Sequence, residues 1–271
     1  MLFQEQVRKV KQAAPKLAAT TNEQRNAALT AVREALLQHQ AEIFEANKQD
    51  LAQAEADGVS GPVRKRLKFD EGKLRDVTAG ISDLTKMEDP LFQTQFAREL
   101  DEGLVLKRVT CPIGVIGVIF EARPDALVQI SALCIKSGNC VILKGGREAL
   151  RSNKKLFDII HEAIIDAGLP ADSMMQLEAR SEINELLECH ESVDLLIPRG
   201  SNAFVQYIMN HTKIPVMGHA DGICHIMWIK MQILRKQFRS LWMRKPSMCL
   251  PATQWRHFWF TKLSKTNCFQ C

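Results

Sequence analysis

The most constraining feature of this sequence is an alternation of short apolar runs with longer amphipathic segments from about residue 115 onward. Short runs rich in Val, Ile and Leu are typical of strands buried on both faces, and the longer segments have helical periodicity. We predict strands at 115–120, 139–144, 174–177, 193–197, 214–217 and 223–227, and helices at about 124–136, 148–167, 181–188 and 201–210. The alternation predicts an α/β fold with a parallel sheet covered on both faces, in which ligands bind at the carboxyl ends of the strands.

The residues before this alternation are predicted to be helical. Thr21 and Gln24 have the spacing of a capping box, in which each side chain bonds the other residue's backbone amide. Apolar residues at helical spacing continue the pattern to about residue 56, and a shorter helix is predicted at about 71–86. The sequence therefore predicts a helical N-terminal region that precedes the sheet.

Between these two regions the pattern changes to that of a hairpin. Residues 96–100 and 104–109 have the composition of strands, and they flank a short turn that contains Gly103. Glycine is favoured at such turns because it adopts positive φ without a steric cost. We predict a β-hairpin here.

The composition excludes several classes of protein. The chain of 271 residues is 46% hydrophobic and 25% charged, as in soluble globular domains, and no uncharged apolar run is long enough to span a membrane. We expect a cytoplasmic protein without a signal peptide. Residues 228–271 contain nine Lys and Arg and no Asp or Glu, whereas the first 227 residues contain 27 Lys and Arg against 31 Asp and Glu. Binding to nucleic acid would therefore depend wholly on this basic tail.

Cysteine and histidine give little sign of a metal site. The eight Cys show no disulfide pattern, and Cys268 with Cys271 forms a lone CxxC, which is weak evidence without a second pair. His219, Cys224 and His225 do not have the spacing of a usual zinc site. We predict no metal ion.

Two loops that follow predicted strands are candidate anion sites. Lys144-Gly145-Gly146-Arg147 joins a strand to a helix, and its two cations could meet a phosphate or ribose; the alternative is an exposed Lys and Arg. Arg199-Gly200-Ser201 also opens a helix, with Ser201 as its N-cap, and an ordinary capped loop is the alternative.

The glycines of an earlier segment are ambiguous in the same way. Gly114 and Gly117 lie at the start of a predicted strand and within it, rather than in the turn that should follow it in a dinucleotide fingerprint. Close packing against neighbouring backbone is as good an interpretation as a role in cofactor binding.

Several segments together resemble one family. They are Gly103-Leu104, Pro-Ile-Gly-Val-Ile-Gly-Val-Ile-Phe-Glu-Ala-Arg-Pro at 112–124, Gly-Asn-Cys-Val-Ile-Leu-Lys-Gly-Gly at 138–146, Pro-Arg-Gly-Ser at 198–201 and Gly-His-Ala-Asp-Gly-Ile-Cys-His at 218–225. In this order they resemble glutamyl phosphate reductase, also called glutamate-5-semialdehyde dehydrogenase, of the aldehyde dehydrogenase superfamily. The resemblance covers about residues 7–226, and its Phe-Glu-Ala-Arg-Pro segment separates this family from other aldehyde dehydrogenases.

The resemblance implies a fold and an activity. The fold would be aldehyde-dehydrogenase-like, with N-terminal helices and a Rossmann-type NADPH-binding domain over residues 1–226 and an oligomerisation hairpin at about 94–110. A homo-oligomer is expected of an intact protein. The implied activity is the NADPH-dependent reduction of L-glutamyl 5-phosphate to L-glutamate 5-semialdehyde and phosphate in proline biosynthesis. A Cys thiolate attacks the acyl phosphate, phosphate leaves, and hydride reduces the thioester.

The resemblance also implies roles for individual residues. Lys144, with Gly145 and Gly146, would bind the adenosine ribose and its phosphate. Arg199, Gly200 and Ser201 would line the cofactor cleft. Arg123 is a candidate for holding the glutamyl group.

The sequence departs from this family after Ile226. The family continues with a Tyr-Val-Asp-like strand, an acidic helix and the nucleophile in a Ser-Ala-Cys-Asn-like loop, none of which aligns here. A shifted reading frame, in which the third base of each codon is read with the first two bases of the next codon, restores the family's pattern. In that frame Met227 with Trp228 encodes Val, Trp228 with Ile229 encodes Asp, and residues 247–260 permit Tyr-Val-Ser-Ala-Cys-Asn-Ala-Val-Glu-Thr-Leu-Leu-Val.

We therefore expect residues 227–271 to be a non-homologous, frameshifted tail and the catalytic domain to be lost. No catalytic residue is assigned, because the neighbours of Cys249 differ from those of the family's nucleophile, and the chain is expected to be inactive. The alternatives are a non-catalytic cofactor-binding fragment, or a protein that binds nucleic acid or membranes through its basic tail. A different aldehyde dehydrogenase is disfavoured by the Phe-Glu-Ala-Arg-Pro segment.

Overall fold

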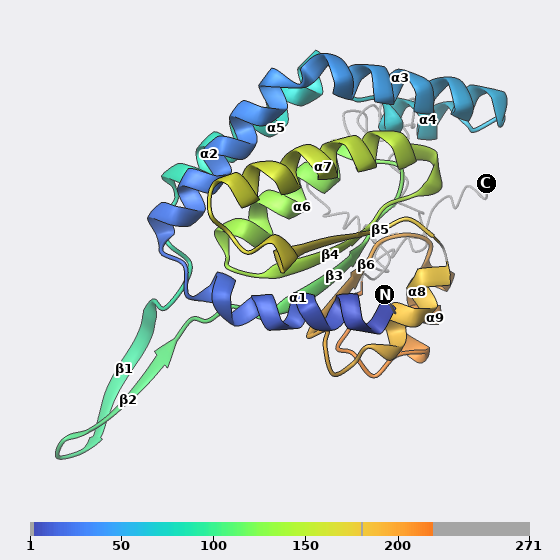
Figure 1. Ribbon diagram of the computed structural model, residues 1–271. Coiled ribbons are helices and arrows are strands. Elements are labelled where there is room, and N and C mark those ends of the chain that lie inside the picture. The colour runs from blue at the N-terminus through green and yellow to red at the C-terminus, as the bar shows by residue number, and fades with distance from the viewer. Residues whose placement is uncertain (1–2, 180, 219–271) are drawn as a thin grey trace, which may run out of the picture. The chain divides into compact units, whose positions relative to one another are not determined.

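The computed structural model describes residues 3–179 and 181–218 (Figure 1). The predicted boundary after residue 226, the predicted strand at 223–227, the residues His219, Cys224 and His225 and the basic tail all lie outside these residues. Within them, no helix combines the length and the apolar character needed to cross a membrane.

A four-stranded parallel sheet forms the centre of the fold. Its strands are β3 (Val115–Ile119), β4 (Cys140–Lys144), β5 (Met174–Leu177) and β6 (Leu195–Pro198), in the order β5-β4-β3-β6. Strand β3, the first of the four in sequence, thus lies between β4 and β6. The chain therefore reverses its direction of winding between β3 and β6, and ligands of open α/β sheets bind at this kind of switch point. The predicted parallel sheet is confirmed.

Helices cover the two faces of the sheet. Figure 1 shows α6 (Pro124–Lys136) and α7 (Leu150–Asp166) on one face, with α2 (Asn22–Gln38) and α5 (Glu71–Lys86) packed outside them. On the opposite face lies α1 (Phe3–Ala18), which contacts three of the strands. All residues of β3 and β4 are buried, as their apolar composition predicts for inner strands.

Strand β3 is fixed closely to its neighbours. A Cβ atom on Gly117 would lie 2.5 Å from Cδ2 of Leu196 in β6, so a larger residue there would displace the Leu196 side chain. Gly114 has a φ of +122°, and a Cβ atom there would meet the carboxylate of Asp194. That carboxylate accepts hydrogen bonds from the Val115 amide at 2.8 Å and from Lys11 of α1 at 2.6 Å. The geometry favours the packing interpretation of both glycines.

The N-terminal region differs in detail from the prediction. The predicted capping box is present: the Gln24 amide donates to Thr21 Oγ1 at 3.2 Å, and the Thr21 amide donates to Gln24 Oε1 at 2.8 Å. The long segment that follows is two helices rather than one, because the chain bends at His39 between α2 and α3 (Gln40–Ala56). The short helix α4 (Gly61–Leu67) was not predicted, although Pro62 in its first turn is a helix-start signal.

The first turn of α7 is capped from another helix. The carboxylate of Asp50 in α3 accepts hydrogen bonds from the Ser152 amide at 2.8 Å and from the Ser152 hydroxyl at 2.7 Å. Both residues are buried. Free amides at a helix start need such partners, so this contact holds the N-terminal helices on the sheet domain.

The hairpin extends away from the sheet domain (Figure 1). It consists of β1 (Thr94–Asp101) and β2 (Leu104–Val109), paired antiparallel, with Gly103 at a φ of +76° in the turn. Every residue of the two strands is exposed, including large apolar side chains such as Phe96, Leu104 and Leu106. The predicted hairpin is present.

The last described segment does not form the strand predicted at 214–217. Only Val216 pairs with the sheet, through a single parallel bridge to Leu196 on the free side of β6. Pro215 interrupts the pairing, because proline has no amide hydrogen to donate. The other late elements are the helices α8 (Ser181–Glu188) and α9 (Asn202–Asn210), which agree with their predicted positions.

An ion pair of a buried arginine with a partly exposed aspartate joins the helices to the root of the hairpin. The Arg25 side chain in α2 is 1% exposed, and its Nη2 donates to both carboxylate oxygens of Asp89, at 2.7 and 2.8 Å. The same carboxylate accepts from the Leu91 amide at 3.0 Å. Asp89 thus neutralises a buried charge and fixes the segment that leads to the hairpin.

We predict that Asp89→Ala lowers the free energy of unfolding by about 3 kcal/mol, because it leaves the Arg25 guanidinium buried without its counter-charge. Urea unfolding followed by circular dichroism measures the change. Asp83→Ala is the matched control, since Asp83 pairs with Lys86 at the surface and should contribute less than about 1 kcal/mol. Equal losses in the two variants would contradict the role given to Asp89.

Candidate functional site

Three loops meet at the carboxyl ends of the central strands. The amide of Phe120, directly after β3, donates to the Lys144 carbonyl at 2.9 Å, and the amide of Arg199, directly after β6, donates to the Ile119 carbonyl at 2.7 Å. These bonds continue the parallel pairing beyond the strands. The structure therefore brings together the loops that hold Arg123, Lys144 and Arg199, which lie far apart in sequence.

The loop after β6 has the predicted helix start. Ser201 is the N-cap of α9, and its Oγ accepts a hydrogen bond from the Phe204 amide at 3.3 Å. Arg199 is exposed beside it, and a Cβ atom on Gly200 would approach Phe204 to 3.1 Å. The positive end of the α9 dipole and the guanidinium of Arg199 therefore lie at the switch point, where they favour an anion.

The loop after β4 is packed more tightly than the sequence predicts. Lys144 is only 5% exposed, and its Nζ donates to the Gly145 carbonyl at 2.7 Å. The alternative of an exposed lysine is therefore wrong for Lys144, whereas Arg147 is exposed. A Cβ atom on Gly145 would lie 2.2 Å from Nδ2 of Asn153, and one on Gly146 would lie 2.6 Å from the Glu148 carboxylate. Side chains on these glycines would therefore displace the end of Asn153 in α7 and the Glu148 carboxylate.

The loop after β3 contains an ion-pair cluster that sequence reasoning missed. Arg123 Nη2 donates to Asp125 at 2.8 Å, and Lys73 of α5 donates to the same carboxylate at 3.3 Å. The Asp125 side chain is 4% exposed, whereas that of Arg123 is half exposed. Hydrogen bonding to Asp125 raises the pKa of Arg123. Asp125 therefore orients a guanidinium whose other side faces solvent.

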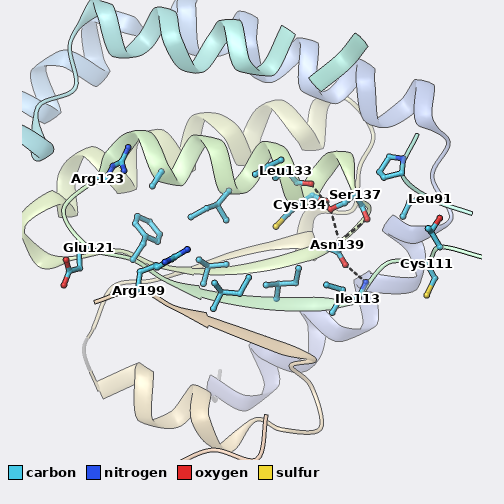
Figure 2. A pocket seen from close by; sticks show the side chains of 18 of the residues that line it. Leu91, Cys111, Ile113, Glu121, Arg123, Leu133, Cys134, Ser137, Asn139 and Arg199 are labelled. Atoms are coloured by element: carbon cyan, nitrogen blue, oxygen red, sulfur yellow. Dashed lines mark hydrogen bonds between the residues drawn. The ribbon is translucent and has the colours of Figure 1, made fainter. Parts of the chain in front are cut away.

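An open groove of about 880 Å³ begins at these loops. Figure 2 shows Glu121, Arg123 and Arg199 at one end of it and Leu91, Cys111 and Ile113 at the other. Between the two ends the groove runs along α6 and one side of β3. It has a charged end at the switch point and a long apolar end toward the root of the hairpin.

The cysteines of the described region do not form a nucleophilic site. Burial raises the pKa of Cys134 and of Cys140 to about 12, and it also raises the pKa of Cys189. A reactive thiolate needs the opposite shift. Cys111 is exposed, but it lies at the apolar end of the groove, away from Arg199 (Figure 2). Among residues 3–179 and 181–218 there is also no group of three or more His, Cys, Asp or Glu side chains placed to hold a metal ion.

The sheet order is that of an open α/β domain whose ligands bind at the switch point. The sequence profile of the aldehyde dehydrogenase family matches residues 3–217, which is more than half of the chain. The chain therefore belongs to the aldehyde dehydrogenase family.

Within this family, the chain is similar to curated gamma-glutamyl phosphate reductases. The one from Ruminiclostridium cellulolyticum is 54% identical over 214 residues, which are 79% of this chain and 50% of that protein. The one from Acetivibrio thermocellus is 53% identical over 83% of this chain and 52% of its own length. The chain thus spans about half the length of the curated relatives it matches.

Solved structures give the same result. The crystal structure of gamma-glutamyl phosphate reductase from Thermotoga maritima matches with a TM-score of 0.82 at 31% identity, over 87% of this chain and 57% of that one. The Saccharomyces cerevisiae structure of that name matches with a TM-score of 0.76 at 41% identity, over 83% of this chain and 58% of that one. The resemblance predicted from the sequence and the aldehyde-dehydrogenase-like fold are both confirmed.

We predict that Asp125→Asn destabilises the fold in a pH-dependent way. Burial acts to raise the pKa of Asp125, but hydrogen bonds and charges from Arg123 and Lys73 outweigh it, so the pKa lies below its ordinary value of 3.8. The stabilisation is therefore full above that value and is lost as the pH falls through the folded-state pKa.

Urea unfolding should show a deficit of about 1 kcal/mol for Asp125→Asn at about pH 7, and this deficit should shrink toward about pH 3. A deficit that stays constant or grows over this range would show that the carboxylate charge is not what stabilises the loop. Asp76→Asn is the control, because Asp76 lies on the same helix as Lys73 but does not belong to the cluster of Arg123, Asp125 and Lys73.

Proposed function

We propose that this chain is the cofactor-binding half of a gamma-glutamyl phosphate reductase. The activity of the whole enzyme would be the NADPH-dependent reduction of L-glutamyl 5-phosphate to L-glutamate 5-semialdehyde and phosphate, in the cytoplasm, as a step of proline biosynthesis. The observation that carries the proposal is the convergence of three loops at the switch point of the sheet. The relatives of this chain are named gamma-glutamyl phosphate reductase.

The residues at the switch point fit a dinucleotide. Arg199 and the start of α9 at Ser201 offer positive charge to phosphate groups. The loop Lys144-Gly145-Gly146 is the proposed site of the adenosine ribose, next to exposed Arg147. Bound there, NADPH would supply the hydride. The role of this chain is to bind and orient the cofactor.

Arg123 is the proposed partner of the substrate's negative charge. Its guanidinium is held by Asp125 and is half exposed at the charged end of the groove. A guanidinium already oriented by a carboxylate loses little freedom when it binds a second anion. This arrangement supports its assignment as the residue that holds the glutamyl phosphate.

The hairpin supports the proposal that an intact protein of this kind is a homo-oligomer. Its two strands contact little else in the described region and expose a row of apolar side chains. Exposed strand edges of this kind readily pair with another chain. We propose no nucleic acid or membrane as a partner.

We predict that the purified full chain binds NADPH and that Arg199→Ala weakens this binding about tenfold, the loss expected for one charge-assisted contact with phosphate. Isothermal titration calorimetry measures both dissociation constants. Arg75→Ala is the control, because Arg75 is exposed on α5 and, among the described residues, its one ion pair is with Glu71 at 3.8 Å. Failure of the folded chain to bind NADPH would contradict the proposed function.

We further propose that the chain alone is inactive and that its tail arises from a frameshift near codon 226. The covalent step needs a thiolate, and loss of a nucleophile costs many powers of ten in rate. In the described region the buried thiols have raised pKa values. The tail itself lies outside that region.

We predict no NADPH oxidation above background when the chain is supplied with L-glutamyl 5-phosphate, with an intact relative as the positive control. Restoring the second reading frame at codon 226 should restore turnover. Turnover by the unaltered chain at the rate of the intact relative would contradict the proposed loss of the nucleophile. A genomic read across codons 224–232 tests the frameshift itself.

A further inference from the structure

One buried side-chain amide in the sheet domain has no hydrogen-bond partner for its oxygen. Asn153, in the first turn of α7, is 1% exposed. Its Oδ1 is the only buried side-chain oxygen without a partner in the described part of the chain. An unpaired buried acceptor weakens the folded state, and native proteins keep few of them. The stability of the fold therefore does not account for an asparagine at this position.

The nitrogen end of the same amide lies against the loop that is proposed to bind the adenosine ribose. A Cβ atom on Gly145 would lie 2.2 Å from Asn153 Nδ2 and 3.3 Å from Cζ of Phe120. Gly145 is thus in contact with both the amide and a buried aromatic ring. Because Gly145 has no side chain, the Asn153 donor can lie close to the backbone of the loop.

The backbone that carries Asn153 is firmly anchored. The amide and the hydroxyl of the preceding residue, Ser152, donate to Asp50 of α3 at 2.8 and 2.7 Å. All three of these residues are buried. A side chain on an anchored helix keeps its position when a neighbouring loop exchanges its hydrogen bonds.

The Gly145 carbonyl has a donor in this structure that cofactor binding would remove. Lys144 Nζ donates to it at 2.7 Å. When this ammonium turns to a ribose or phosphate oxygen, the carbonyl loses that hydrogen bond in a loop that is partly buried. Backbone acceptors in such places need a partner, so the loss would oppose binding. Asn153 Nδ2 lies beside the same residue and can replace the ammonium.

We propose that Asn153 is a positioning residue of the cofactor loop: when Lys144 turns to the ribose, Asn153 Nδ2 donates to the Gly145 carbonyl in its place. The inference rests on the proposed function. Asn153 does not touch the cofactor, and it stabilises the loop in the state in which Lys144 binds it. The amide thus serves the bound state, although its Oδ1 has no partner in the state without cofactor.

The test compares fold stability and NADPH affinity in the full chain with Asn153→Leu, which replaces the amide by an apolar group of similar shape. The midpoint of urea unfolding should stay equal or rise, because an unpaired polar group is removed. The dissociation constant of NADPH, from isothermal titration calorimetry, should rise about fivefold, the effect of one hydrogen bond between uncharged groups. Asn153→Ala, which cannot overpack the site, should show the same loss of affinity.

Asn139→Leu is the matched control. Asn139 is 6% exposed and directly precedes β4, at the opposite end of that strand from Lys144. Its Oδ1 accepts from the amides of Ile113 and Gly114, at 2.7 and 2.9 Å, and Figure 2 shows the bond to Ile113. Loss of these bonds should lower the urea midpoint and leave the NADPH affinity of the folded protein unchanged. This is the reverse of the pattern expected for Asn153→Leu.

A double-mutant cycle with Lys144→Met shows whether Asn153 acts through the lysine. Lys144→Met removes the ammonium from the Gly145 carbonyl with and without cofactor, so Asn153→Leu should cause no further loss of affinity in that background. A fivefold loss that persists there would overturn the proposal. An unchanged affinity together with a lower urea midpoint for Asn153→Leu would also overturn it, since that result identifies a purely structural residue.

The measurements separate this proposal from the proposed function. NADPH binding that is insensitive to Asn153→Leu and Asn153→Ala would support the cofactor site and overturn the role of Asn153. Absence of NADPH binding by the unaltered, folded chain would overturn both.

Discussion

The parallel pairing of β3 with both β4 and β6 is the constraint on which the rest of this structure depends. It places the first strand in the middle of the sheet, so the loops after three strands emerge side by side. Gly117 favours that position, because a side chain there would displace Leu196. The position also requires the Asp194 carboxylate, which ties the start of β3 to Lys11 of α1. Packing at one end of the sheet thus sets the geometry of the loops at the other.

Much of this fold can be read from local sequence signals, and the exceptions have physical causes. The helices α5, α6 and α8 and the strand β5 lie where periodicity predicts them. Periodicity could not locate the bend at His39, because α2 and α3 each keep an apolar side toward neighbouring helices. The pattern at 214–217 resembles a strand, but pairing there also needs an amide that Pro215 lacks.

In the candidate site, features set by neighbouring residues were predictable from the sequence, whereas contacts between distant segments were not. Ser201 was predictable as an N-cap because the signal lies within four residues. The sequence could not show that Lys144 is buried, or that Lys73 of α5 joins Asp125 and Arg123. Those contacts join segments separated by the hairpin and a strand. The groove is also a tertiary feature, since its walls come from α6, β3 and the segments that lead to and from the hairpin.

The residues proposed to bind the cofactor all belong to one part of the fold. All of the candidate cofactor residues lie between residues 144 and 201, within one sheet and its own helices, and their positions are fixed by backbone bonds between β4, β3 and β6. The relatives are about twice as long as the segment they share with this chain. The proposed cofactor site would therefore be local to that segment, whereas the thiolate of the proposed reaction would come from the remaining part of such an enzyme.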